Sequence, residues 1–373
     1  MHIGVPKETQ AGETRVAATP ETIKKLISQG HSVTVAQGAG LAASVSDEAY
    51  AAVGARLASQ EAALAADIVL KVVAPSAAEL EHIKPQAVVI GMLNPFCNAT
   101  IAALNARQIT AFALEAAPRS SRAQSLDVLS SQANIAGYKA VLLAAHYYPR
   151  FMPMLMTAAG TVKAARILIL GAGVAGLQAI ATAKRLGAVI EASDVRPAVK
   201  EQIESLGAKF VDVPFVTDEE RECAEGVGGY ARPMPASWME RQAQAVHERA
   251  KQADIVITTA LIPGRQAPTL LDAATVEAMK PGSVVIDLAA AQGGNCPLTV
   301  ADQVITHQGV TIVGYTNLAA QVAADASALY ARNLLDFLKL VIAENGQFTL
   351  NLDDDIVAAC LVCHAGEVIR INP

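Results

Sequence analysis

A glycine-rich turn between an apolar strand pattern and a helix pattern is the feature that most constrains this chain. Gly171, Gly173 and Gly176 follow the apolar run Ile167–Leu170 and open a helix pattern over Gln178–Leu186. In such a turn the first glycine makes the sharp reversal, the second lets a phosphate group approach the backbone, and the third allows the helix to pack closely on the strand. The helix N-terminus adds amide donors and partial positive charge. The motif therefore predicts a Rossmann-type strand, turn and helix that bind a dinucleotide.

An acidic residue closes the next predicted strand, roughly 20 residues after the glycine turn. Asp194 lies where a carboxylate accepts hydrogen bonds from the adenosine ribose of NAD and repels the 2′-phosphate of NADP. We therefore expect selectivity for NAD(H). Arg196 is the one nearby residue that favours NADP(H) instead. The alternative to a nucleotide site is a glycine turn in an empty Rossmann domain.

Short β-rich runs alternate with helix patterns in two stretches of the chain, which indicates parallel sheets with helices on both faces. The predicted strands of the first stretch are 1–5, 31–36, 67–73, 87–93 and 109–113. Those of the second stretch are 165–170, 188–192, 209–213, 254–258, 283–288 and 310–313. The predicted fold class is α/β, with two Rossmann-like, doubly wound parallel-sheet domains separated by a cleft.

Two long Ala/Leu-rich helix patterns, Ser130–Tyr148 and Ala323–Ala343, mark the changes between domains. We expect both helices to pass between the domains and the C-terminal segment to return to the first one. The first predicted domain is discontinuous and comprises residues 1–130 and 322–373. The second, residues 131–321, is the predicted NAD(H)-binding domain.

The composition narrows the range of partners and locations. Only 4% of the 373 residues are aromatic, and 29 Lys and Arg stand against 35 Asp and Glu. Such a chain lacks the basic surface and the stacking side chains of a nucleic-acid-binding protein, so no nucleic-acid partner is expected. Five cysteines and a charged, proline-containing start favour a cytoplasmic location. Two uncharged stretches, 167–183 and 308–324, contain glycines or polar residues that argue against membrane spans.

A polar segment, Arg119–Ser130, is conspicuous in so apolar a chain, and we call it the loop 119–130. It ends the first predicted sheet and enters the following helix, so we expect it to face the cleft where the nicotinamide end of a dinucleotide projects. Its hydrogen-bonding side chains include Arg119, Arg122, Gln124 and Asp127. The alternative is a solvated helix entrance with capping residues.

The loop 119–130 and several further segments are similar to one enzyme family. The loop residues Arg119–Asp127 are followed by Leu129–Tyr138. The other segments are Val5–Glu8, Glu13–Ala17, Thr157–Val162, Gly171–Lys184, Thr258–Gly264 and Gly293–Pro297. Together they resemble the NAD(H)-binding component of proton-translocating nicotinamide nucleotide transhydrogenase, over nearly the whole chain. The sequence departs from that family at Lys163–Ala164, where Pro-Pro is frequent, and at Ala319–Gln321, where the family has Pro-x-Arg.

The resemblance implies hydride transfer between NAD(H) on this chain and NADP(H) on a partner domain, coupled to proton translocation by membrane-embedded partner subunits. It implies a homodimer, peripheral on the inner membrane through those subunits, and no metal. Gln124, Arg119 and Asp127 would position the nicotinamide without acid or base chemistry. The residues that the resemblance assigns to NAD(H) are Arg119, Ser120, Ser121, Arg122, Gln124, Asp127, Ser130, Gly171, Gly173, Val174, Ala175, Gly176, Asp194, Val195, Arg196, Gly229, Tyr230 and Leu261.

Two other functions stay open. Alanine dehydrogenase shares this architecture and Arg15, but its chemistry needs proton transfers. Where those enzymes carry a lysine, a histidine and a cleft aspartate, this chain has Val73, Asn94 and Ala291. Hydride transfer between two nicotinamides moves no proton to or from the protein, so these replacements favour a transhydrogenase. A non-enzymatic NAD-sensing module is the second alternative.

Two further patterns bear on mobility and on metals. The glycine-rich segment Gly226–Tyr230 precedes Pro233 in a connection too long for an ordinary loop, which predicts a mobile flap. Cys360, Cys363 and His364 match the C-x-x-C-H pattern of haem attachment. They lie in an apolar, strand-like run without a second Cys/His pair nearby, so neither haem nor zinc is predicted.

Overall fold

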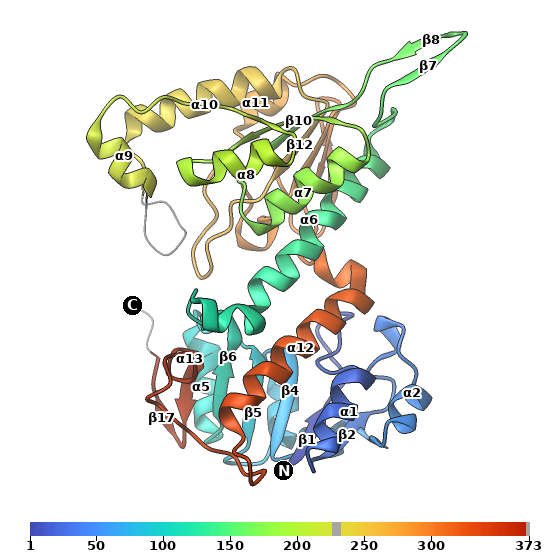
Figure 1. Cartoon of the computed structure of the whole chain (residues 1–373), viewed down its shortest axis with the longest axis vertical. Coiled ribbons are helices and arrows are strands. Elements are labelled where there is room, and N and C mark those ends of the chain that lie inside the picture. The colour runs from blue at the N-terminus through green and yellow to red at the C-terminus, as the bar shows by residue number, and fades with distance from the viewer. Residues whose placement is uncertain (226–232, 371–373) are drawn as a thin grey trace. The chain divides into compact units, whose positions relative to one another are not determined.

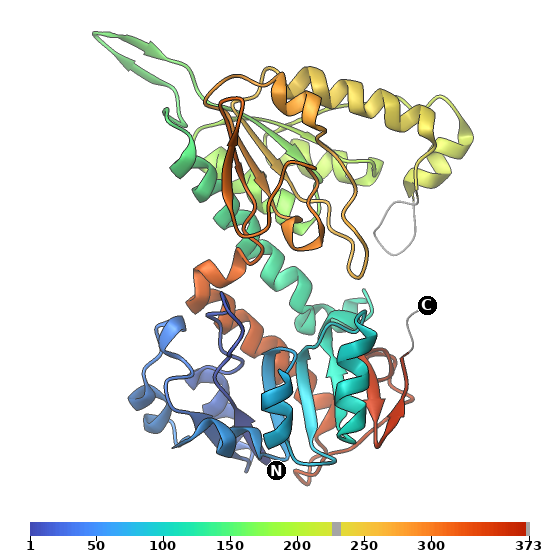
Figure 2. The same ribbon diagram turned by 180° about the vertical axis from the view of Figure 1, so that it is seen from behind.

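The computed structural model describes residues 1–225 and 233–370, which form two compact units (Figure 1 and Figure 2). The first unit comprises Met1–Gln132 and Ala319–Pro373, and the second comprises Ala133–Leu318. Helix α6 (Val128–Tyr147) carries the chain into the second unit, and the return falls between Leu318 and Ala319. Helix α12 (Ala323–Val341) therefore lies wholly in the first unit, instead of passing between the two as the sequence suggested.

The sheet of the first unit has the strand order β17-β16-β6-β5-β4-β1-β2-β3. The bounds are β1 His2–Val5, β2 Ser32–Ala36, β3 Arg56–Ala58, β4 Ile68–Val73, β5 Val88–Met92, β6 Thr110–Ala113, β16 Leu361–His364 and β17 Glu367–Val368. Strands β1 to β6 are parallel, as predicted. Strand β16 pairs antiparallel with β6 and with β17, so the C-terminal segment completes one edge of this sheet.

Helices cover both faces of this sheet. The helices of the first unit besides α12 are α1 Pro20–Ser28, α2 Asp47–Ala52, α3 Gln60–Leu64, α4 Ala77–His82, α5 Asn98–Ala106 and α13 Asp355–Cys360. Successive residues of a strand point to opposite faces, and Leu70 of β4 packs in the core that includes α12 while Val69 packs in the core that includes α5. Figure 1 shows α12 and α1 on the near face of the sheet. Burial on both faces explains why strands such as β4 and β5 are mostly apolar in sequence.

The sheet of the second unit has the strand order β11-β10-β9-β12-β13-β15-β14. The bounds are β9 Arg166–Leu170, β10 Val189–Ser193, β11 Lys209–Phe210, β12 Ile255–Thr258, β13 Val284–Asp287, β14 Val304–His307 and β15 Val310–Val313. All neighbours are parallel except β14 and β15. Because β10 lies on one side of β9 and β12 on the other, the strand order reverses beside β9. In open parallel sheets, ligands bind at such a switch point.

The helices of the second unit likewise cover both sheet faces. They are α7 Val174–Arg185, α8 Lys200–Ser205, α9 Asp218–Glu225, α10 Ala236–Ala250 and α11 Ala273–Glu277, together with most of α6. Ile169 of β9 packs in one core and Leu168 in the opposite one. Within the described ranges, no helix is both long and apolar enough to cross a membrane.

A β-hairpin that the sequence did not predict precedes β9. Its strands are β7 (Leu155–Thr157) and β8 (Gly160–Val162), paired antiparallel. In both views the hairpin extends away from the sheet of its own unit (Figure 1 and Figure 2). Met154 and Met156 are 62% and 71% exposed, so the hairpin presents apolar side chains to solvent.

Candidate nucleotide-binding site

The glycine turn between β9 and α7 has the geometry that the motif predicts. Gly171 has a φ of +94°, and a Cβ added there would lie 2.6 Å from the Thr259 Oγ1. A Cβ on Gly176 would lie 2.0 Å from the Gly171 carbonyl oxygen. The first position therefore needs glycine for the backbone conformation and the third for close packing of helix on strand.

Gly173 differs from the other two glycines because the space above it is open. The nearest atom to a Cβ added there is the Arg196 Nη2, at 3.9 Å. Gly173 is also the N-cap of α7, and it brings no side chain to cap the first amides of that helix. An open approach to uncapped amides at a helix N-terminus fits a pyrophosphate group.

Asp194 lies beside this turn, just beyond the end of β10. Its Oδ2 accepts hydrogen bonds from the Ala172 amide (2.7 Å) and from the Arg196 Nη2 (2.8 Å). Its Oδ1 accepts from the Arg196 backbone amide and Nε, both at 2.9 Å. A carboxylate has about four lone-pair sites, and these four donors use them. A ribose hydroxyl can therefore bond Asp194 only if the Arg196 side chain moves, so Arg196 competes with the ribose for the carboxylate.

The loop after β12 lies against the glycine turn. The Thr259 amide donates to the Leu170 carbonyl (2.9 Å) and the Thr259 Oγ1 to the Gly171 carbonyl (2.8 Å). Leu261, next in this loop, is 36% exposed. Of the predicted residues, the structure brings together Gly171, Gly173, Gly176, Asp194 and Arg196. Val174, Ala175 and Val195 adjoin them in the chain, and Leu261 lies in the same loop as Thr259.

Asn295 holds this loop and was not predicted as a site residue. It is fully buried; its Nδ2 donates to the Ala260 and Pro268 carbonyls (both 2.8 Å), and its Oδ1 accepts from the Ala260 amide (3.0 Å). An asparagine has both donors and an acceptor, so it pairs with both backbone groups of Ala260 at once. Its place in Gly293–Pro297 was the only signal in the sequence.

The loop 119–130 belongs to the first unit and leads into α6. Residues Ser121–Leu126 form a 3₁₀ helix in which Gln124 is exposed. Asp127 accepts hydrogen bonds from the Ser130 amide (2.9 Å) and the Ser130 Oγ (2.6 Å). This is the pattern of a helix N-cap, so two predicted site residues also stabilise the start of α6.

The arginines of the loop have different surroundings. Arg122 makes a two-point contact with Asp354, through its Nη1 (2.6 Å) and Nη2 (2.8 Å), and also pairs with Asp355. Asp354 is the N-cap of α13, so Arg122 ties the loop to the C-terminal segment. Arg119, like Ser121, is exposed, and Ser120 is half-buried. The predicted flap, with Gly229 and Tyr230, lies outside the described residues.

The positions where relatives carry acid–base residues have apolar or amide side chains, but a carboxyl lies beside one of them. The Glu115 oxygens accept from the Asn94 amide (2.6 Å) and the Leu93 amide (3.1 Å). Burial raises the pKa of Glu115 to about 7, although those amide bonds favour the charged form. Because both oxygens bind backbone amides, the geometry assigns Glu115 to holding the loop after β5.

Arg15, which alanine dehydrogenases share, is bound within the chain. Its Nε and Nη2 donate to the Glu13 carboxylate (2.8 and 2.6 Å), and its Nη1 donates to the Gln132 Oε1 (2.9 Å). A guanidinium already paired in this way offers a substrate carboxylate little, since a second carboxylate would have to displace the first.

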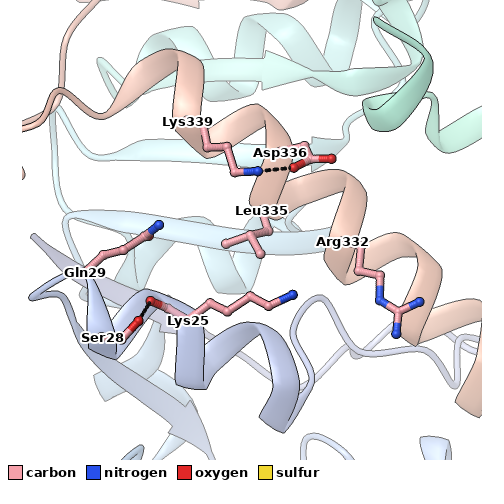
Figure 3. Close-up of a pocket in the computed structure, with 7 residues that line it drawn as sticks. All are labelled: Lys25, Ser28, Gln29, Arg332, Leu335, Asp336 and Lys339. Atoms are coloured by element: carbon pink, nitrogen blue, oxygen red, sulfur yellow. Dashed lines mark hydrogen bonds and ion pairs between the residues drawn. The ribbon is translucent and has the colours of Figure 1, made fainter.

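The cysteines of the C-x-x-C-H pattern are buried, and the charged groups of a groove on the first unit are paired within the chain. Cys360 and Cys363 are fully buried, the Cys363 Sγ contacts the Ile109 carbonyl, and no metal-binding group of His, Cys, Asp and Glu occurs in the part of the chain that the structure describes. A groove between α1 and α12 is lined by Lys25, Ser28, Gln29, Arg332, Leu335, Asp336 and Lys339 (Figure 3). Its cations are already paired with carboxylates, Lys25 and Arg332 with Glu21 and Lys339 with Asp336, so it offers no free charge to an anion.

Comparison with known proteins agrees with the fold and the resemblance. The family description "Alanine dehydrogenase/PNT, N-terminal domain" matches residues 4–136, and "Alanine dehydrogenase/PNT, C-terminal domain" matches residues 140–370. A polypeptide of the NAD(P) transhydrogenase alpha subunit from Rhodospirillum rubrum is 50% identical over 379 residues, covering 99% of this chain and 98% of the relative.

Two solved structures are similar over the whole chain. A transhydrogenase from Sinorhizobium meliloti has a TM-score of 0.90 and 47% identity, covering 99% of this chain and 100% of that one. An L-alanine dehydrogenase has a TM-score of 0.79 and 26% identity, covering 99% and 96%. These matches confirm the predicted fold class and the resemblance to transhydrogenase. The chain therefore belongs to the alanine dehydrogenase/PNT family, within which it is a transhydrogenase-type oxidoreductase component.

Proposed function

We propose that this chain binds NAD(H) and is the component of a proton-translocating transhydrogenase in which hydride passes between that NAD(H) and NADP(H) on a partner domain. The observation that carries the proposal is the open approach to the α7 amides above Gly173, with the Asp194 carboxylate beside it. A pyrophosphate and an adenosine ribose need those two groups at that separation along the chain. The similarity to transhydrogenase alpha subunits supports the assignment.

The glycine turn, Asp194 and the loop 119–130 would each bind a different part of NAD(H). The α7 amides at Val174, Ala175 and Gly176 would bind the pyrophosphate. Asp194, with Val195, would bind the adenosine ribose once the Arg196 side chain moves away from the carboxylate. The loop 119–130, through Arg119, Gln124 and Asp127, would orient the nicotinamide and its ribose. Bound NAD(H) supplies the hydride donor or acceptor. The protein's contribution is to position the ring and exclude water.

The missing acid and base residues agree with this reaction. Val73, Asn94 and Ala291 cannot carry a proton, and oxidation of alanine would require one to be moved. Arg15 is paired with Glu13 and Gln132, which also argues against an amino-acid substrate.

The proposal extends to partners. Relatives that match this chain are named as subunits, and we propose that it likewise works with membrane-embedded subunits and an NADP(H)-binding domain, as a homodimer at the inner membrane. The membrane subunits would couple hydride transfer to proton translocation.

Binding measurements on the purified chain test the nucleotide assignment. We expect NADH to bind at least tenfold more tightly than NADPH, because Asp194 would face a 2′-phosphate with like charge. An Asp194→Asn variant should narrow that preference while retaining folding. Equal affinities of the unaltered chain for NADH and NADPH would contradict the proposal. They would indicate that Arg196 accommodates the 2′-phosphate of NADPH.

A further inference from the structure

A buried side chain of α12, Asn333, forms hydrogen bonds with the loop 119–130 and with the start of α6. The Asn333 Nδ2 donates to the Ser125 carbonyl at 2.7 Å, and its Oδ1 accepts from the Ser131 Oγ at 2.8 Å. Asn333 is only 7% exposed, whereas Ser125 and its neighbour Gln124 are exposed. A rigid helix thus fixes the backbone next to an exposed side chain.

The surrounding contacts keep Asn333 in one orientation. The Ser131 Oγ also accepts from the Gln132 Nε2 (3.2 Å), and Gln132 donates to the Ala326 carbonyl of α12 (3.1 Å). The Asn333 Oδ1 is therefore held by Ser131 of α6. In this orientation the Asn333 Nδ2 faces the Ser125 carbonyl. A buried network whose members are all paired holds one conformation, because any rotation leaves a polar group unpaired.

A second contact holds the loop at Arg122, which pairs with Asp354 through two hydrogen bonds and also with Asp355. It acts two residues before Gln124, whereas Asn333 bonds the backbone of the residue next to it. Ala123 and Leu126 are buried and fix the inner side of the 3₁₀ helix by apolar packing. The bond from Asn333 to Ser125 is a polar contact between a buried side chain and the residue next to Gln124.

We propose that Asn333 is a positioning residue for Gln124, so that α12 sets the geometry of the loop 119–130 without touching the nucleotide. This proposal rests on the function proposed above. Hydride transfer needs the two reacting carbons about 3–3.5 Å apart, and a shift of about 1 Å can cost a factor on the order of 10² in rate. Nucleotide affinity, which comes mainly from the glycine turn and Asp194, should not depend on Asn333.

The test uses Asn333→Asp, which keeps the shape and the acceptor for Ser131 but loses the donor to Ser125. Ser131→Ala is the matched control, since it removes the other bond and leaves the Ser125 bond in place. Amide hydrogen exchange of residues 121–127, measured on the nucleotide-free protein, reports the anchoring directly. Asn333→Ala serves as a second variant if Asn333→Asp does not fold.

We expect Asn333→Asp to speed exchange in residues 121–127 by about tenfold or more and to lower hydride transfer to the partner's NADP(H) by roughly 10- to 100-fold, with NADH affinity within about threefold. Ser131→Ala should have much smaller effects on both. If Asn333→Asp left the exchange of residues 121–127 unchanged, the proposal would be overturned. Faster exchange with unchanged hydride transfer would also overturn it, and so would a loss of NADH affinity as large as the loss of the hydride-transfer rate. If the unaltered protein shows no hydride transfer, the proposed function fails, and the exchange result still decides whether Asn333 anchors the loop.

Discussion

At the scale of single residues, the exposed position of Gln124 on an anchored loop determines what a substitution there can do. Gln124→Asn keeps the amide and shortens its reach by about one methylene group, which is enough to misplace a contact by about 1 Å. We expect hydride transfer to fall by a factor on the order of 10² while NADH binds nearly as before, because the contact acts mainly in the transition state. Stopped-flow kinetics measure the rate of hydride transfer and titration measures NADH affinity, with Gln29→Asn, just after α1, as a control. A proportional loss of affinity would make Gln124 an ordinary binding residue.

Glu115 predicts a pH dependence of stability. Its pKa of about 7 in the folded chain lies above the ordinary value of 4.5, so from pH 4.5 to 7 the unfolded chain releases a proton that the folded chain keeps. Stability should therefore fall as pH rises through this window, by at most about 3 kcal/mol from this group. Glu115→Gln should remove that contribution.

Urea unfolding between pH 4.5 and 7.5 measures the effect as the difference between the unaltered chain and Glu115→Gln. The control is Glu21→Gln, because hydrogen bonds from Arg332 and Lys25 lower the pKa of Glu21 to about 2, outside the window. If the difference for Glu115→Gln were as flat with pH as that for Glu21→Gln, the carboxyl would already be ionised in the folded chain.

The residues that could be predicted and those that could not differ in where their partners lie. The spacing of Gly171, Gly173 and Gly176 encodes a local turn, so the sequence predicts it. Asn333 bonds a carbonyl 208 residues away, and Asn295 bonds groups 35 and 27 residues away. Neither belongs to a short motif whose spacing reveals its partner, so their roles emerge only from the fold.

At the scale of elements, most of the strands predicted correctly are buried on both faces, and the short β11 is the exception. Strand β9 is apolar from Ile167 to Leu170, and β4 is apolar except for the buried Lys71, which pairs with Glu8 and Glu79. The missed strands lack that signal. Strands β3, β7 and β8 are only three residues each and partly exposed, and β14 has no fully buried residue. Helix α10 was missed because its sequence, Ala236–Ala250, is polar and follows prolines and glycines that indicate a loop.

The hairpin β7–β8 is the element on which we expect the proposed homodimer to depend. Met154 and Met156 are exposed on a hairpin that extends from its unit, and large exposed apolar side chains favour association with another chain. Replacing both with Asp should shift the protein from dimer to monomer in sedimentation velocity, at a concentration where the unaltered chain is dimeric. Val216→Asp is the control, since Val216 is also 71% exposed but lies outside the hairpin. A double variant that stays dimeric would exclude the hairpin from the interface.

At the scale of the whole molecule, each unit has its own sheet and its own cores, and the proposed tasks divide between them. The second unit carries the glycine turn and Asp194, and the first carries the loop 119–130 with its support from α12. The sequence indicated the two sheets because each is a run of alternating strands and helices. It did not reveal that the C-terminal strands add antiparallel to β6, because such pairing depends on an edge that no local pattern encodes.

The most direct test of the proposed reaction follows a label on the hydride. NADH carrying deuterium at the transferred position is mixed with the purified chain, an NADP(H)-binding partner domain and NADP⁺ in ordinary water. We predict that the deuterium appears in NADPH without loss to the solvent, and that alanine with NAD⁺ gives no NADH above background, because hydride transfer needs no proton from the protein. Steady formation of NADH from alanine by the purified chain, or label that exchanges with water, would contradict direct transfer between the two nucleotides.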